Sequence, residues 1–393
     1  LVWKRSQEKS FARDTILLAA LEERRADDFY LENLARVFEL HPCGANQTLE
    51  QHLFAYLARV RGREHPAFPR WDIEQWGLAD AQQQLDIYFI ANKLMNGWIQ
   101  LLQGQMRGQK PTIPLLQEAL TAAEVPGFKG NFYIDCYALA IQDLQAENCN
   151  GKTAAILRDR VLPKLERLPA RDHFGLFNLL LNYHIIWDLH ADGDADVDME
   201  HFALVKLGLE KGYLLRDGEI SYADFYNTTS LAMDMNELAW GEAFVDQYSP
   251  HLPEKVRAAS TIFARARLRM AARDFRHALR LLSQKDALTS EIDHVVERIL
   301  RIKCYYELEE DELLEHLLEA TRKHTSRTKG IAVGFRDQTN AFVRFTRQLH
   351  KARRAPDGRP EVLTQVLATL REERAVASRE WLLTKVNALL ENC

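Results

Sequence analysis

The chain has 393 residues, of which 47% are hydrophobic and 27% charged, and its formal net charge is −5 at pH 7. This balance is typical of a folded protein, and no stretch approaches the roughly 20 apolar residues that span a bilayer, which argues against a membrane-embedded protein. The five cysteines are scattered without a CxxC pair, which excludes a disulfide framework or a zinc module and predicts a reducing, cytoplasmic location.

Helical segments are expected along the whole chain. Runs rich in Leu and Ala, such as residues 115–123, 132–144 and 174–189, alternate with breaks of Pro, Gly, Asn and Asp and give about eighteen segments of helical length. No alternation of apolar and polar residues is long enough to predict a strand. We therefore predict an all-α protein in which consecutive helices pack antiparallel as hairpins and the hairpins stack into an α-solenoid.

The N-terminal third repeats less regularly than the rest. A polar connection is expected around residues 61–76 and a long helix around residues 81–106. Because one compact core is unfavourable at this chain length, we expect an N-terminal helical region over residues 1–125, formed by divergent repeats or a small bundle. Residues 126–393 are then an array of helical hairpins with a basic C-terminal helix. The first residue is Leu1 rather than Met, which leaves a further upstream domain open.

Gly151, Lys152 and Thr153 match the end of a phosphate-binding loop. That loop requires a second glycine where Ala146 stands, and it follows a strand so that its backbone amides converge on phosphate. Here the preceding segment is predicted to be helical. The sequence therefore favours a helix N-cap at Asn150 over an ATPase site.

An acidic segment at residues 192–198 places carboxylates at alternate positions, as a calcium loop does. Val197 stands where the calcium loop needs Gly, and Ala203 stands where it needs a bidentate Glu. We interpret the segment as an acidic loop between two helices.

Two pairs of side chains have the spacing of metal ligands on one helix face. Glu291 and His294 form a Glu-x-x-His pair, and His184 is four residues before Asp188. Each pair supplies two ligands, whereas a zinc site requires three or four and a di-iron bundle requires a second Glu-x-x-His. We therefore predict no catalytic, cofactor-binding or metal site, and the alternative is a helical-bundle enzyme whose residues converge from distant segments.

Three windows in the second half of the chain repeat one apolar pattern. Residues 231–244, 266–279 and 302–315 carry apolar side chains in the same columns, at a spacing of about 35 residues. An apolar stripe at i, i+3 and i+7, a polar break and a second apolar helix together indicate a helical hairpin. A fixed spacing of this length predicts stacked hairpins.

The window 269–282 resembles the tetratricopeptide pattern: the residues Arg273-Asp274-Phe275 resemble its turn, and Ala278 resembles its small packing residue. Residues 305–318 look like the next copy. Bulky residues replace the family's small first-helix residue in two of the copies, and no regular closing Pro is present. The chain is thus similar to tetratricopeptide repeats over residues 221–321. The resemblance implies a protein-binding superhelix that holds its ligand on the concave face.

Residues 320–360 contain eleven Lys and Arg against two Asp, a local charge of +9 in a chain of net −5. On a helix over residues 334–354, four apolar side chains lie within one sector of about 80° and five cations lie within a second such sector on the opposite side. The apolar side chains are Phe335, Phe342, Phe345 and Leu349. The cations are Arg336, Arg344, Arg347, Lys351 and Arg354.

We predict that these five cations contact an anionic partner, most simply an acidic protein surface. The alternative is a solvated face, or one that pairs with acidic neighbours such as residues 307–315. Nucleic acid is a less favoured partner, because the phenylalanines lie on the buried stripe and are not available for base stacking.

The function predicted from these features is that of a non-enzymatic scaffold or adaptor that binds protein partners through a helical-repeat surface. A sensor or regulatory helical module of a larger multi-component system is the first alternative, and the enzyme described above is the second. Trp381, Leu382, Leu383 and Val386 near the C-terminal end predict an apolar surface for self-association.

Overall fold

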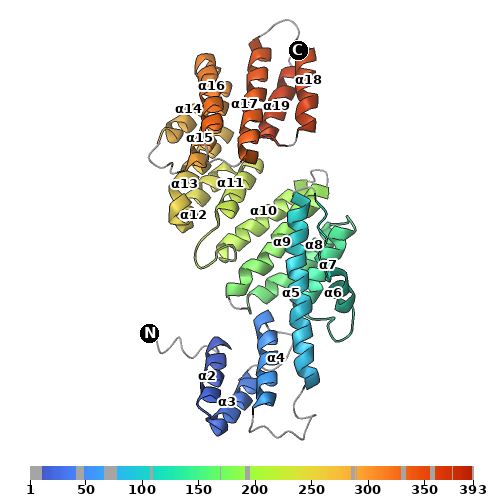
Figure 1. Cartoon of the computed structure of the whole chain (residues 1–393). Coiled ribbons are helices and arrows are strands. Elements are labelled where there is room, and N and C mark those ends of the chain that lie inside the picture. The colour runs from blue at the N-terminus through green and yellow to red at the C-terminus, as the bar shows by residue number, and fades with distance from the viewer. Residues whose placement is uncertain are drawn as a thin grey trace. The chain divides into compact units, whose positions relative to one another are not determined.

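The computed structural model describes most of the chain and gives eighteen α-helices, labelled in Figure 1. The residues it describes are 11–40, 48–65, 78–106, 109–168, 170–190, 195–284, 288, 290–328, 333–354, 359–373 and 375–391. These ranges contain helices and turns but no β-strand, apart from one isolated bridge between Arg216 and Glu219. The predicted all-α class is confirmed.

The chain divides into two compact units, Leu1–Leu214 and Leu215–Cys393. The boundary expected at residue 125 falls inside the first of them. The helices of the first unit are α2 (Phe11–Glu23), α3 (Asp27–Leu40), α4 (Leu49–Glu64), α5 (Leu78–Met106), α6 (Leu116–Ala123), α7 (Phe132–Gln145), α8 (Gly151–Leu165), α9 (Ala170–His190) and α10 (Ala195–Glu210).

The long helix expected in the first unit is α5, with 29 residues. It packs against α4, α6 and α7, while α8 packs against α9 and α9 against α10. Trp98 of α5 and Tyr183 of α9 are both buried, and their ring centroids lie 6.5 Å apart. The predicted cap is also confirmed: Asn150 Oδ1 accepts a hydrogen bond from the Thr153 amide (3.1 Å), directly after helix α7 rather than after a strand.

The second unit contains nine α-helices and one short 3-10 turn, η1 (Ser249–His251). The helices are α11 (Tyr222–Asp234), α12 (Leu238–Tyr248), α13 (Glu254–Ala271), α14 (Phe275–Leu282), α15 (Glu291–Glu307), α16 (Asp311–Arg327), α17 (Val333–Arg354), α18 (Arg359–Glu372) and α19 (Arg379–Glu391). Each helix contacts the next one, and every second helix, from α11 through α13, α15 and α17 to α19, also contacts its successor in that series. The core of this unit is therefore formed by helices that follow one another closely along the chain.

Three turns in the second unit repeat one backbone conformation. Asn236, Arg273 and Glu309 have φ values of 56°, 58° and 58°, in the left-handed region. The residue after each one donates its amide hydrogen to a carbonyl five residues earlier, which is the bond of a Schellman motif. The bonds are Glu237 to Ala232 (2.8 Å), Asp274 to Arg269 (2.8 Å) and Glu310 to Tyr305 (3.0 Å). The three turns end α11, α13 and α15 in the same way, so these helices have equivalent positions counted back from the turn.

Small residues allow neighbouring helices in this unit to approach closely. Ala266 of α13 and Ala278 of α14 are both fully buried in one apolar cluster. At Gly241 of α12, an added Cβ would lie 2.7 Å from Leu268 of α13. A larger residue at any of these positions would separate the helices.

Candidate functional site

Where the structure describes them, the metal ligands suggested by the sequence do not gather into larger groups. Some of them lie outside the described residues. The Glu291 carboxylate lies 3.3 Å from His324 Nε2. His184 is buried, with Nδ1 2.9 Å from the Leu180 carbonyl oxygen and Nε2 3.6 Å from Glu200. The side chain of Asp188 and residues 191–194 of the acidic loop lie outside the described residues. Among the side chains that the structure describes, no three His, Cys, Asp or Glu residues come close enough to hold a metal ion.

Helix α17 has the orientation predicted from its amphipathic pattern. Phe342, Phe345 and Leu349 are buried in the core formed by α15 to α19, and Phe335 is partly buried against it. On the opposite side, Arg344 and Arg354 have 52% and 63% of their side chains exposed, whereas Arg347 has 29%. The predicted separation of apolar and cationic faces is confirmed.

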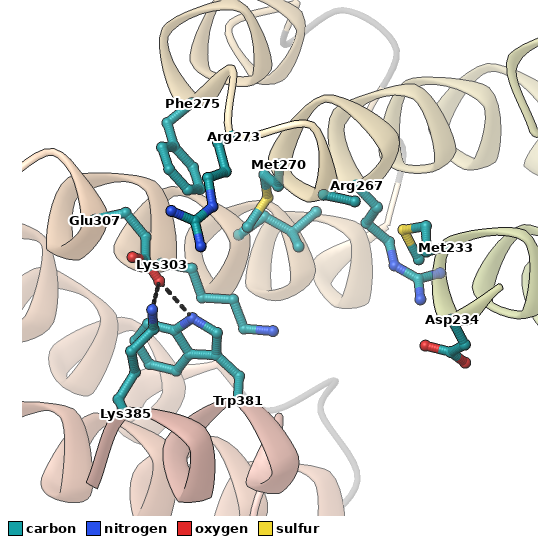
Figure 2. A pocket seen from close by; sticks show the side chains of 12 residues that line it. Met233, Asp234, Arg267, Met270, Arg273, Phe275, Lys303, Glu307, Trp381 and Lys385 are labelled. Carbon is teal, nitrogen blue, oxygen red and sulfur yellow. Dashed lines mark hydrogen bonds and ion pairs between the residues drawn. The ribbon is translucent and has the colours of Figure 1, made fainter. Parts of the chain in front are cut away.

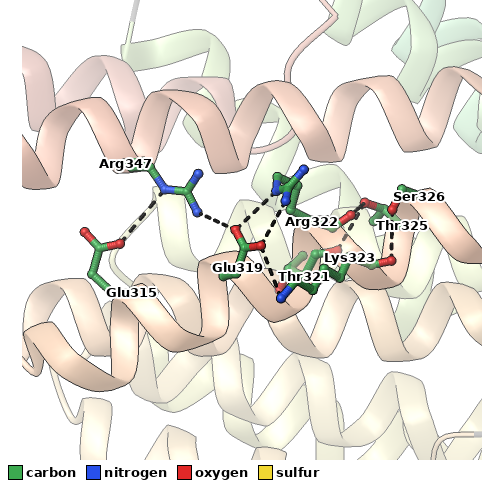
Figure 3. Close-up of polar contacts among 8 residues, drawn as sticks. All are labelled: Glu315, Glu319, Thr321, Arg322, Lys323, Thr325, Ser326 and Arg347. Carbon is green, nitrogen blue, oxygen red and sulfur yellow. Dashed lines mark hydrogen bonds and ion pairs between the residues drawn. The ribbon is translucent and has the colours of Figure 1, made fainter.

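Most of the predicted cations have partners within the second unit. Arg344 pairs with Glu373, Arg354 lies 3.7 Å from Asp311, and Arg336 donates to the Thr328 carbonyl oxygen (3.0 Å). Arg347 lies between Glu319 (3.3 Å) and Glu315 (4.0 Å), as Figure 3 shows. Pairing with acidic neighbours is thus present, and a role in binding a partner remains a prediction.

Glu319 on α16 is the centre of this network (Figure 3). Its carboxylate is contacted by Arg322 (2.9 Å), Lys323 (3.5 Å) and Arg347 (3.3 Å). The hydrogen bond from Arg322, helped by the other positive charges, lowers the pKa of Glu319 to about 2. Three cations meet two carboxylates here, Glu319 and Glu315, which leaves an excess of positive charge at this surface.

A hollow of about 440 Å³, here called the basic hollow, lies beside this network between α16 and α17. Its lining includes four cations, Arg322, Arg344, Arg347 and Lys351. Lys351 is exposed, and its ammonium has no ion pair among the described side chains. Three of the five residues predicted from the sequence are therefore brought together in one depression.

A larger hollow of about 620 Å³, here called the inner hollow, is lined by residues of α11, α13, α15 and α19, by the turn after α13 and by the first residue of α14 (Figure 2). Sequence analysis did not identify it. Its lining consists of Met233, Asp234, Arg267, Met270, Ala271, Arg273, Phe275, Leu300, Lys303, Glu307, Trp381 and Lys385.

Equivalent positions of successive helices line the inner hollow. Counted back from the left-handed turn residues, Arg267 of α13 and Lys303 of α15 both stand six residues before the turn. Met233 of α11 and Met270 of α13 both stand three residues before it. Positions six and three residues before the turn lie on one face of a helix, so equivalent faces of α11, α13 and α15 line the hollow.

The C-terminal helix contributes one wall of the inner hollow through Trp381. The Trp381 ring packs edge-on against Tyr306, with centroids 5.3 Å apart, and its Nε1 donates to Glu307 Oε1 (3.0 Å). Lys385 Nζ lies 2.6 Å from the same oxygen. Glu307 is therefore already neutralised by α19.

Lys303 faces Trp381 across the inner hollow (Figure 2), and its ammonium lies 5.6 Å from the centre of the ring. Within the described ranges it has no hydrogen bond or ion pair. Burial, together with the positive charge of Arg267, lowers the pKa of Lys303 to about 8. The protein thus holds an ammonium at a position that disfavours its charge.

The two arginines of the inner hollow differ in how they are held. Arg267 donates to Ser230 Oγ (2.8 Å), its guanidinium stacks 4.1 Å from the centre of the Tyr226 ring, and burial lowers its pKa. Arg273 is exposed, and its guanidinium has no ion pair or hydrogen bond in the part of the chain that the structure describes. Arg267 is therefore held by a hydrogen bond and a ring contact, whereas Arg273 is exposed and available to a ligand.

Most of the apolar residues predicted for self-association are packed into the core of the second unit. Leu382 and Val386 are fully buried, and Leu383 packs against the same core. Trp381 is shared between that core and the inner hollow. Self-association remains a prediction that these contacts do not support.

Comparisons with protein-family models, with curated proteins and with solved structures find no match for this chain. Among the described helices, none has the length and apolar character needed to cross a bilayer.

Proposed function

We propose that the protein is a non-enzymatic adaptor that holds a segment of a partner protein in the inner hollow. In this proposal the second unit is a solenoid of tetratricopeptide-like antiparallel hairpins, with α11, α13, α15 and α17 as first helices. The contacts between sequence neighbours and the three equivalent turns support that arrangement. Repeat arrays of this kind gain their binding surface from one face of successive repeats.

One observation carries the proposal: equivalent positions of consecutive helices line one open hollow of about 620 Å³. Its wall combines flexible and aromatic apolar side chains, Met233, Met270, Phe275 and Trp381, with charged groups. Methionine and aromatic side chains adapt to the side chains of a bound segment, and a few charges orient it. An extended or helical segment in a groove is a common mode of protein recognition.

The basic hollow is proposed as a second contact surface for an acidic partner. The five residues predicted from the sequence to contact a partner are Arg336, Arg344, Arg347, Lys351 and Arg354, and Arg344, Arg347 and Lys351 line this hollow. Support comes from the excess positive charge around Glu319 and from the unpaired ammonium of Lys351. Because the other cations have partners, this surface is expected to contribute to association rate more than to affinity.

A ligand-sensing module of a larger system is the alternative function. The volume of the inner hollow lies within the range of small-molecule sites, roughly 300 to 1,000 Å³. A small molecule that binds there and blocks peptide binding would favour this alternative.

The experiment uses a bulky substitution inside the inner hollow and a matched one beside it. Ala271 lines the inner hollow, whereas its neighbour Ala272 does not, and both are exposed. Random dodecapeptides displayed on phage are selected on the full chain, and the affinity of a selected peptide is measured by calorimetry. We expect Ala271→Trp to abolish binding and Ala272→Trp to leave it unchanged. Failure to enrich any peptide, or equal binding to both variants, contradicts the proposal.

A further inference from the structure

We propose that the segment held in the inner hollow is acidic, and that its carboxylates pair with Lys303 and Arg273 while its apolar side chains contact Met270 and Phe275. This inference rests on the proposed function and names the chemistry of the partner.

The charges of the inner hollow do not balance. Its lining contains four cations, Arg267, Arg273, Lys303 and Lys385, against two carboxylates, Asp234 and Glu307. Glu307 is occupied by Lys385 and by the indole of Trp381. Asp234 lies on the side of Arg267 (Figure 2), whose pKa it raises. Among the described residues, the side chains of Lys303 and Arg273 form no ion pair, and the carboxylate charge that acts on Lys303 is that of Glu307, which is already shared with Lys385 and Trp381.

Lys303 is the clearest sign of a missing anion. Its ammonium is held over the Trp381 ring, and burial and the positive charge of Arg267 on α13 outweigh the opposing charge of Glu307. A partly buried charge without a partner destabilises the folded chain, and a ligand carboxylate beside it removes that cost. A partly desolvated charge that forms no ion pair and lines a hollow is typical of a binding site.

The character of the lining favours carboxylates over the phosphates of a nucleic acid. The Trp381 face is covered by Lys303, so it does not offer a surface on which a base stacks. The apolar side chains of Met270 and Phe275 match a segment in which acidic and apolar residues alternate.

Binding is expected to depend on the protonation of Lys303. Its ammonium is faced by Arg267 from α13, by Glu307 and Cys304 of its own helix α15, and by Lys385 and Trp381 from α19. A peptide carboxylate is ionised throughout the neutral and basic range, so affinity is expected to fall as the pH rises above about 8. A site in which arginine alone holds the peptide would show no such fall.

The test titrates the full chain with three blocked hexapeptides of sequence Glu-Leu-Glu-Glu-Leu-Glu, the same with Gln for Glu, and the same with Lys for Glu. We expect the acidic peptide to bind at least about tenfold more tightly than the Gln peptide, the usual size of a charge-assisted contact. Lys303→Met and Arg273→Gln are each expected to weaken the acidic peptide about tenfold and to leave the Gln peptide unchanged. Arg276→Gln is the matched control, because Arg276 is a neighbouring cation with 74% of its side chain exposed and does not line the hollow.

The inference is overturned if the Gln peptide binds as tightly as the acidic one, or if Lys303→Met leaves the affinity for the acidic peptide unchanged. It is also overturned if the acidic peptide does not bind, or if a single-stranded oligonucleotide of equal charge binds more tightly through Lys303. In any of these cases the proposed function still stands if library-selected peptides bind the wild type and fail to bind Ala271→Trp. Failure of that selection removes both proposals.

Discussion

Replacing Lys303 by Met is predicted to stabilise the protein at neutral pH. Methionine has a similar length and no charge, so the substitution keeps the contact with Trp381 and removes the buried ammonium. In the folded chain the pKa of Lys303 is about 8, against 10.5 for an ordinary lysine. A difference of this size corresponds to at most about 3 kcal/mol of folding free energy. Water in the open hollow reduces that cost, so we expect a gain of about 1 to 3 kcal/mol at pH 7.

The effect has a defined pH dependence. Below pH 8 the lysine is charged in both the folded and the unfolded chain, and the folded wild type bears the full cost of burying the charge. Between about pH 8 and 10.5 the unfolded chain binds more protons at this site than the folded chain, so the stability of the wild type rises with pH. The advantage of Lys303→Met is therefore expected to shrink towards zero by about pH 10.5.

The assay is urea unfolding of the full chain and of Lys303→Met at pH 7 and pH 10, followed by circular dichroism. Comparing the two proteins at each pH removes the contributions of other titrating groups. Lys255→Met, at an exposed position of α13, is the control and should change the stability by less than about 0.5 kcal/mol. A variant that is less stable than the wild type at pH 7, or an advantage of equal size at both pH values, would refute the reasoning.

Two further predictions concern α17 and the repeated turns. Changing Arg344, Arg347 and Lys351 together to Glu should leave the helical circular dichroism intact and reduce binding to immobilised polyglutamate at least about tenfold at low salt, because three charges of the basic hollow reverse. Unchanged binding would count against a role for this surface. Glu309→Gly should raise the free energy of unfolding by about 0.5 kcal/mol. Glycine adopts the left-handed backbone at φ 58° without steric strain, and this gain exceeds the cost of its greater conformational entropy in the unfolded chain. Urea unfolding checks this, and a loss of stability would show that the Glu309 side chain, 4.0 Å from Arg353, contributes more than the backbone strain costs.

The helices were predictable because their hydrogen bonds and side-chain periodicity are local. The long helix α5 was expected over residues 81–106 and is observed as Leu78–Met106. Phe342 and Phe345 were placed on the buried side of α17 from their spacing, and both are buried. Asn150 was identified as a cap because its side chain satisfies an amide three residues away.

The register of the three repeated apolar windows was less well determined by the sequence. The spacing from Asn236 to Arg273 is two residues longer than the alignment of Leu231 with Ala266 implies. An apolar stripe at i, i+3 and i+7 fits several neighbouring registers equally well. The turns that set the true register carry Asn, Arg and Glu in the left-handed conformation, where glycine would have marked them.

Sequence alone determined the helical class and the polarity of α17, since each of these depends on residues within one or two turns of helix. The tertiary structure decided that Arg344 meets Glu373 and that Lys303 meets Trp381. The first pair joins α17 to the residue after α18, and the second joins α15 to α19. Both pairs depend on how the helices cross and on where each side chain points after packing. Which cations are neutralised, and which remain available in the inner hollow, is settled by that packing.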